Sequence, residues 1–84
     1  MKHATAPALD TLEPLLARLR AIDGFKEKSR GVFYRKSRAV LHFHEDPAGL
    51  FADFRPAEEW DRFPVNTAAE RSALLRAAAA FAKA

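Results

Sequence analysis

The chain has 84 residues, which is the length of a single domain, and 49% of them are hydrophobic, which is too many for a disordered chain. It contains no cysteine, so disulfides, thiolate metal sites and cysteine nucleophiles are excluded. No run of residues is long and apolar enough for a signal peptide or a membrane span. We therefore expect a cytoplasmic protein that does not associate with membranes.

The positive charge is concentrated in one segment. The net charge is only +3, but residues 25–38 hold six basic side chains against one acidic one. A local excess of this kind is typical of a surface that binds phosphate groups, and equally of a β-hairpin that charge keeps soluble. The six basic residues are Lys26, Lys28, Arg30, Arg35, Lys36 and Arg38.

The first predicted element is a helix over residues 11–22. We expect residues 1–9 to be a disordered N-terminal lead and residues 10–84 to form a single α+β domain. Asp10 or Thr11 would cap the helix, and Pro14 would fall in its first turn, where a missing N–H is tolerated. Leucines recur every three or four residues and form its apolar stripe.

The hydrophobic period then changes to two, which indicates strands. We predict four of them, over residues 31–35, 38–45, 50–55 and 62–65. Lys36 and Ser37 form a two-residue turn, residues 46–49 form a second turn, and Pro64 confines the last strand to an edge. A second helix over residues 67–82 begins with a capping box of Thr67 and Glu70. The order α-β-β-β-β-α predicts a four-stranded antiparallel sheet with two flanking helices in two layers.

The two turns fix which side chains share a face of the sheet, because directly opposed residues point the same way. His42 is then opposite Asp53 on the neighbouring strand. The predicted core face carries Val32, Tyr34, Ala39, Leu41, Phe43, Ala52 and Phe54. The predicted open face carries Phe33, Arg35, Arg38, Val40, His42, His44, Phe51, Asp53 and Arg55. We expect Trp60 to cap the core.

His42 and His44 stand on the open face with Asp53 opposite. Two imidazoles and a carboxylate are a set of metal-ligand types, and the pair His42–Asp53 could also serve in acid–base chemistry. The simpler interpretation is a partly exposed pair in which Asp53 hydrogen-bonds His42 and raises its pKa. Since only two imidazoles converge, we expect no tight metal site. No cofactor fingerprint and no catalytic nucleophile is evident, so no cofactor is expected and catalysis is unassigned.

The basic and aromatic side chains of the open face predict other ligands. Arg35, Arg38 and Arg55 favour anions, and Phe33 and Phe51 among them are also compatible with nucleic acid, a less favoured alternative because no RNP-type motif is present. An open face with Phe33, Val40 and Phe51 could instead pair with a second copy in a homodimer.

The run from Arg38 to Val65 contains the pattern apolar-His-x-His followed by Asp-x-Arg, formed by His42, His44, Asp53 and Arg55. In this it resembles small bacterial proteins of unknown function and is similar to the so-called luciferase-domain family. The resemblance implies that these four residues form a shared functional surface.

Together these observations predict a small domain that binds an anionic ligand or partner through an open sheet face. The predicted ligand-binding residues are His42, His44, Asp53, Arg55, Arg35 and Arg38. A minimal enzyme or metal site on the same face, and a homodimeric structural or interaction module, are the alternatives.

Overall fold

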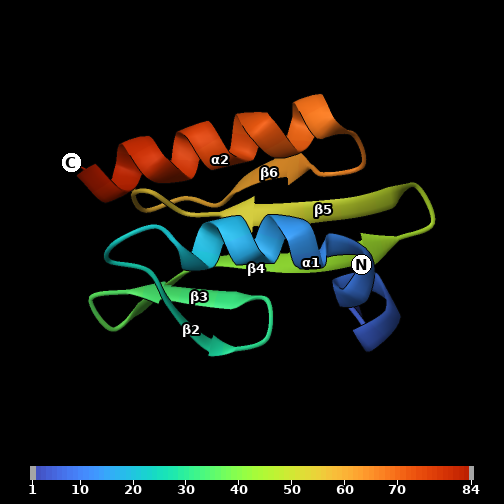
Figure 1. Ribbon diagram of the computed structural model, residues 1–84, viewed down its shortest axis with the longest axis horizontal. Helices are drawn as coiled ribbons and strands as arrows, with labels where there is room; N and C mark the ends of the chain where they lie inside the picture. The colour runs from blue at the N-terminus through green and yellow to red at the C-terminus, as the bar shows by residue number, and fades with distance from the viewer. Residues whose placement is uncertain (1, 84) are drawn as a thin grey trace.

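Two helices and an antiparallel sheet make up the computed structural model, which describes residues 2–83. This confirms the predicted α+β class (Figure 1). In chain order the elements are β1 (Lys2–His3), α1 (Ala6–Arg20), β2 (Lys26–Ser29), β3 (Val32–Arg35), β4 (Arg38–Asp46), β5 (Gly49–Phe54), β6 (Asp61–Pro64) and α2 (Ala68–Lys83).

The sheet has more strands than the sequence predicts. Its main path follows the order β2-β3-β4-β5-β6, and the short β1 pairs with β4 beside that path. The four predicted strands are present as β3 to β6, and Pro64 does lie in the edge strand β6. The prediction of only four strands is wrong because the sequence of β2, Lys-Glu-Lys-Ser, has no apolar alternation to reveal it.

Charged side chains connect β2 and its turn to α1. The guanidinium of Arg20 lies 2.5 Å from both Glu13 and Glu27, and that of Arg30 lies 2.7 Å from Asp10 and 2.9 Å from Glu13. Hydrogen bonds from Arg20 and Arg30 lower the pKa of Glu13 to about 2. Ion pairs within the fold therefore neutralise part of the charge of residues 25–38.

The N-terminal residues differ from the predicted disordered lead. β1 pairs with the far half of β4, with His3 opposite His44, and α1 begins at Ala6 rather than at residue 11. Pro7 is in the first turn of the helix, so Pro14 lies inside it and not in its first turn. The backbone N–H of Thr5 donates to the Glu45 carboxylate at 2.6 Å, which ties this end of the chain to β4.

The second helix begins as predicted. The Glu70 N–H donates to the Thr67 hydroxyl at 3.1 Å, and the Thr67 N–H donates to the Glu70 carboxylate at 3.1 Å. The helix then runs to Lys83, with Leu74 and Ala78 buried. The capping box is therefore a correct prediction.

The predicted register of β4 and β5 is correct at every pair from Leu41–Phe54 to Glu45–Leu50, including His42 opposite Asp53. The register of β3 and β4 is correct at Arg35–Arg38 and Tyr34–Ala39, where Lys36 and Ser37 form the turn with positive φ angles of 53° and 69°.

Beyond Tyr34 that register is wrong. An irregularity puts Phe33 opposite Leu41 instead of Val40. The extra residue in β4 reverses which side chains face the core. Phe33 and Val40, predicted to be on the open face, are buried, whereas Val32, Tyr34 and Ala39 are only partly buried.

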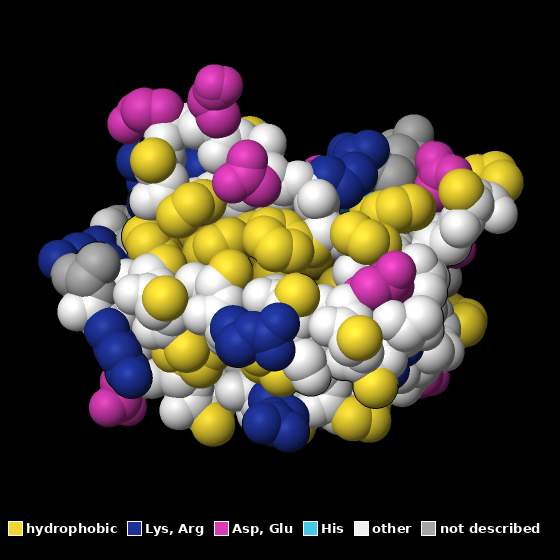
Figure 2. All heavy atoms as spheres, turned by 90° about the horizontal axis from the view of Figure 1, so that it is seen from above, with side chains coloured by type: hydrophobic (Ala, Val, Ile, Leu, Met, Phe, Trp, Pro, Cys, Tyr) yellow, Lys and Arg dark blue, Asp and Glu magenta, His cyan; other side chains and the backbone are white. Residues whose placement is uncertain are grey.

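The helices cover the face of the sheet that carries Leu41, Phe43, Ala52 and Phe54, and these side chains form the core with the leucines of α1. A second view shows a band of hydrophobic side chains and no histidine on the side displayed (Figure 2). No helix within residues 2–83 is long and apolar enough to cross a membrane.

The irregularity near Phe33 predicts that two phenylalanines contribute differently to the stability of the fold. Phe33 is fully buried and Phe51 is not, so Phe33→Ala should lower the free energy of unfolding by about 3–5 kcal/mol and Phe51→Ala by clearly less. Urea denaturation of the two variants measures this. An equal or smaller cost at Phe33 would contradict the observed register.

Candidate functional site

Alternation along β4 determines where its two histidines lie. Leu41 and Phe43 point into the core, so His42 and His44 stand on the face away from the helices, as predicted. Both are partly buried. No helix contributes to their surroundings in the contacts among residues 2–83; they instead meet β1, β5 and the loop before β6.

A third histidine completes a cluster that the sequence did not predict. His3, from β1, stacks on His44 with ring centroids 5.0 Å apart and lies 5.7 Å from the ring of His42. The rings of His42 and His44 are 4.6 Å apart. One nitrogen from each imidazole lies within 4.8 Å of the others. We call His3, His42 and His44 the histidine cluster.

Asp53 is the buried carboxylate of this face, with only 8% of its surface exposed. A buried carboxylate needs a counter-charge, and Arg62 from β6 supplies it, donating through Nε at 3.0 Å and Nη2 at 3.4 Å. His44 Nε2 lies 3.1 Å from Asp53 Oδ2, the oxygen that also accepts from Nη2. The predicted partner, His42, makes no hydrogen bond to Asp53 in the described contacts, because the carboxylate reaches diagonally across the strands to His44.

Three imidazole nitrogens of the cluster are buried without a hydrogen bond. They are Nδ1 of His42 and both Nδ1 and Nε2 of His44, whose Nε2 is near Asp53 but not aligned with it. Buried polar atoms in folded proteins nearly always have a partner, since an unpaired one is destabilising. These nitrogens therefore point to a ligand.

The pKa of His42 also differs from its prediction. Burial lowers it below the ordinary value, the neighbouring His44 lowers it further, and Asp53 only partly opposes these effects. We expected Asp53 to raise it; the expectation was wrong because desolvation of the ring outweighs a carboxylate that is already paired with Arg62. The neutral form of His42 is therefore favoured.

Trp60 joins the histidine cluster to Arg55. Its ring lies 4.6 Å from the ring of His42, and the guanidinium of Arg55 lies 4.5 Å above the indole. Trp60 is 40% exposed, so it forms a lid over this face and not the predicted cap on the core. Arg55 also donates to the Ala39 carbonyl at 2.7 Å, which fixes its position.

The remaining predicted residues, Arg35 and Arg38, do not reach the histidine cluster. Arg35 donates to the Ala82 carbonyl of α2 and stacks on Phe81, 4.9 Å from the ring centroid. Arg38 donates to the Ala57 carbonyl at 2.6 Å. Together with Arg55 and Lys36 they line a pocket of about 240 Å³, whose other lining residues are Val40, Pro56 and Phe81. We call this the basic pocket.

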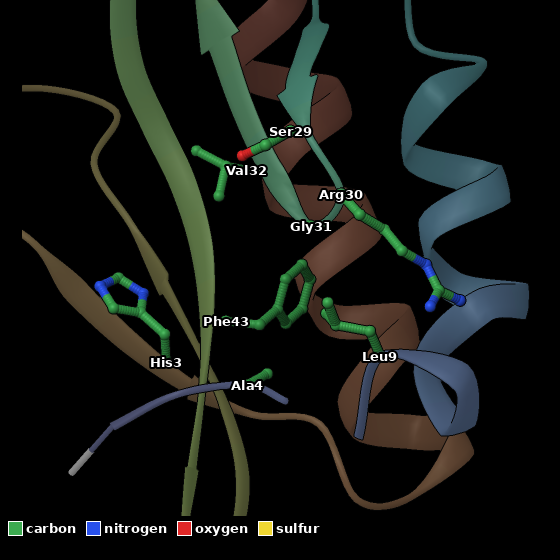
Figure 3. Close-up of a pocket in the computed structure, with 8 residues that line it drawn as sticks. All are labelled: His3, Ala4, Leu9, Ser29, Arg30, Gly31, Val32 and Phe43. Carbon is green, nitrogen blue, oxygen red and sulfur yellow. The ribbon is translucent and has the colours of Figure 1, made fainter. Parts of the chain in front are cut away.

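A second pocket, of about 310 Å³, lies beside the histidine cluster, where β1 and β3 leave a gap along β4. His3 and Phe43 line it from opposite sides of β4, and Leu9 of α1 is on the side of Phe43 (Figure 3). The gap leaves the side of His3 accessible.

The structure thus divides the predicted site in two: His42, His44 and Asp53 in one part, Arg35 and Arg38 in the other, and Arg55 between them. Sequence reasoning missed His3, Lys36 and Arg62 as members. Lys36 was visible in the basic segment, and Arg62 could have been found from the register of β6 opposite Asp53. His3 carried no signal beyond being the third histidine of the chain.

Comparison of the chain with protein-family models, curated proteins and solved structures finds no match. Nothing in these comparisons bears on the similarity to the luciferase-domain family, which stays a prediction. The functional argument therefore depends on the geometry of the chain itself.

The His42 pKa can be measured by an NMR titration of chelator-treated protein. It should lie below 6.5. Asp53→Asn should lower it further by removing the one nearby charge that raises it, while Asp23→Asn, in the exposed turn after α1, should leave it unchanged. A pKa above 6.5, or one insensitive to Asp53, would contradict the described environment.

The lowered pKa of His42 determines how its contribution to stability changes with pH. Because the folded-state pKa of His42 is lowered, the unfolded chain binds the proton more readily. The contribution of neutral His42 is fully present above the unfolded value of 6.5 and is lost as the pH falls toward the folded pKa. His42→Gln should therefore reduce the loss of stability between about pH 7 and pH 5, measured by urea denaturation; an unchanged pH profile would contradict this assignment.

Proposed function

We propose that the domain binds a small anionic ligand, with the anionic group in the basic pocket. The observation that supports this most directly is the lining of that pocket: four cationic side chains, and no acidic one among the described lining residues. Like charges converge on one pocket only at a cost in electrostatic repulsion, and an anion in the pocket removes that cost.

Main-chain carbonyls help to position the three arginines of the pocket. Arg35 and Arg38 flank the Lys36-Ser37 turn, and Arg55 follows the end of β5. Each arginine uses one nitrogen to bind a main-chain carbonyl, of Ala82, Ala57 and Ala39 respectively. Because a guanidinium has five N–H donors, Arg38 and Arg55 each keep donors for a ligand. For these two, Glu58 is the only acid with an ion pair in the described contacts, 3.8 Å from Arg38, and its side chain is 90% exposed.

The size and chemistry of the pocket favour a single phosphate, sulfate or carboxylate group. Its volume of about 240 Å³ is below the roughly 300 Å³ at which pockets for drug-sized ligands begin. Arginine recognises such groups through paired, charge-assisted hydrogen bonds. Val40, Pro56 and Phe81 supply apolar contacts.

Arg55 gives the ligand a direction in which to extend. It belongs to the basic pocket and also stacks on Trp60, which contacts His42. A ligand with its anionic group in the pocket would therefore lie across Trp60 toward the histidine cluster. In this way the residues predicted from the sequence act on one ligand although they occupy two parts of the structure.

The proposal is tested by titrating inorganic phosphate and pyrophosphate into the protein, with calorimetry and backbone NMR shifts as readouts. Arg38→Gln combined with Lys36→Gln should weaken binding by about tenfold or more, because a charge-assisted hydrogen bond is lost. Arg18→Gln combined with Arg76→Gln removes the same charge from exposed positions on the helices and should leave affinity nearly unchanged.

Two results would contradict the proposal. One is an equal loss of affinity in both double variants, which would indicate only a general effect of net charge. The other is an absence of phosphate binding together with binding of single-stranded RNA whose affinity falls steeply with salt, which would assign the surface to nucleic acid.

A further inference from the structure

The three histidines of the chain occupy one site although 39 positions separate His3 from His42. β1 places His3 opposite His44, and the alternation of β4 puts His42 on the same face two residues away. No other group of three possible metal-ligating side chains lies this close together among residues 2–83. The expectation of no tight metal site rested on two imidazoles, and the structure supplies a third.

The imidazole nitrogens of this cluster have unmet bonding capacity, as metal ligands need. Nδ1 of His42 and Nδ1 of His44 are buried and accept or donate no hydrogen bond among the described residues. One nitrogen from each of the three rings lies within 4.8 Å of the other two. In a zinc site with Zn–N bonds of 2.0–2.1 Å, ligand nitrogens are about 3.4 Å apart. The exposed ring of His3 can close the difference by rotating.

Asp53 supplies a supporting contact for a metal-bound histidine. Metal-bound histidines typically turn their second nitrogen toward a carboxylate, which holds the ring in place. The Nε2 of His44 lies 3.1 Å from Asp53 Oδ2, near it although not aligned with it, so its Nδ1 is the atom left for the metal. Arg62 in turn holds Asp53 through two nitrogens. Asp53 is thereby fixed beside the ring of His44 before any ion binds.

The donor set selects the class of ion. Three imidazoles with no thiolate suit borderline transition metals such as zinc, and they do not suit calcium or magnesium, which prefer oxygen ligands. Three protein ligands leave a fourth tetrahedral position for water or an anion. The exposed side of His3, beside the gap between β1 and β3, leaves room for it.

We propose that His3, His42 and His44 bind one divalent transition-metal ion per chain, with zinc the best fit, and that Asp53 orients His44 for it. This site is separate from the basic pocket and does not depend on an anion being bound there. An anion held near Arg55 and Trp60 would lie on the same face, so the two sites could share one ligand.

The test is a calorimetric titration of tag-free, chelator-treated protein with Zn²⁺ in buffer without phosphate. One ion per chain should bind, and His3→Ala should weaken binding by at least about tenfold. His3 is the best position to change because its side chain is exposed and no core residue depends on it. Arg38→Gln, in the basic pocket, should leave zinc affinity unchanged.

A second readout and a control guard against surface binding. Co²⁺ should give the visible absorption of a tetrahedral ion with nitrogen ligands, and the ring signals of all three histidines should shift together in NMR spectra at one equivalent of zinc. Glu58→Gln combined with Glu59→Gln, which removes exposed carboxylates near Trp60, should change nothing.

Three results would overturn the proposal: no binding at micromolar zinc, undiminished affinity in His3→Ala, or equal weakening by the carboxylate control. The last would show that zinc binds only to exposed acids. A failure here would leave phosphate binding in the basic pocket unaffected, so the two proposals can be judged separately.

Discussion

The pairing of β4 with three other strands is the constraint on which the rest of the structure depends. β5 covers one edge of β4 along its length, while β3 and β1 divide the other edge between them. The strand thus holds Leu41 and Phe43 in the core and His42 and His44 on the opposite face. A shift of one residue in any of these pairings would exchange the two sets of side chains and remove both the core and the cluster.

The same pairing controls the charge of the histidine face. Asp53 comes from β5 and Arg62 from β6, in register with each other, so the carboxylate is neutralised within the sheet. With Asp53 satisfied and the ring of His42 desolvated, neutral imidazole is favoured there. Positive charge is instead concentrated at the end of the sheet, where Arg35, Lys36, Arg38 and Arg55 gather. The face therefore joins a nitrogen-rich part, the histidine cluster, to a strongly cationic one, and Trp60 lies between them.

The sequence alone predicted the register of β4 against β5 and the second helix, because local signals determine both features. The turn at residues 46–49 and strict alternation on both sides of it fix the register of β4 against β5. This register places His42, His44 and Asp53 on one face of the sheet. The capping box at Thr67 and Glu70 gave the second helix. In these segments turn chemistry, hydrophobic period and hydrogen bonding all favour the same structure.

The missed features depend on contacts between distant parts of the chain. The irregularity between Phe33 and Tyr34 follows two correctly predicted pairs, and no residue type there signals a bulge. β2 has no apolar alternation, and its Glu27 instead pairs with Arg20 of α1. β1 is too short to show any period, and its position depends on the edge of β4 that β3 leaves free. For this reason His3, the residue that changes the chemistry of the face, could not be assigned from the sequence.

The central claim, that β1 and β4 bring the histidines together, is tested most directly by nuclear Overhauser effects in the metal-free protein. The account predicts cross-peaks between ring protons of His3 and His44, whose centroids are 5.0 Å apart. It also predicts backbone contacts across the pairs His3–His44 and His42–Asp53. Random-coil shifts for His3 without a cross-peak to His44 would contradict it, and so would a register that places His44 opposite Asp53.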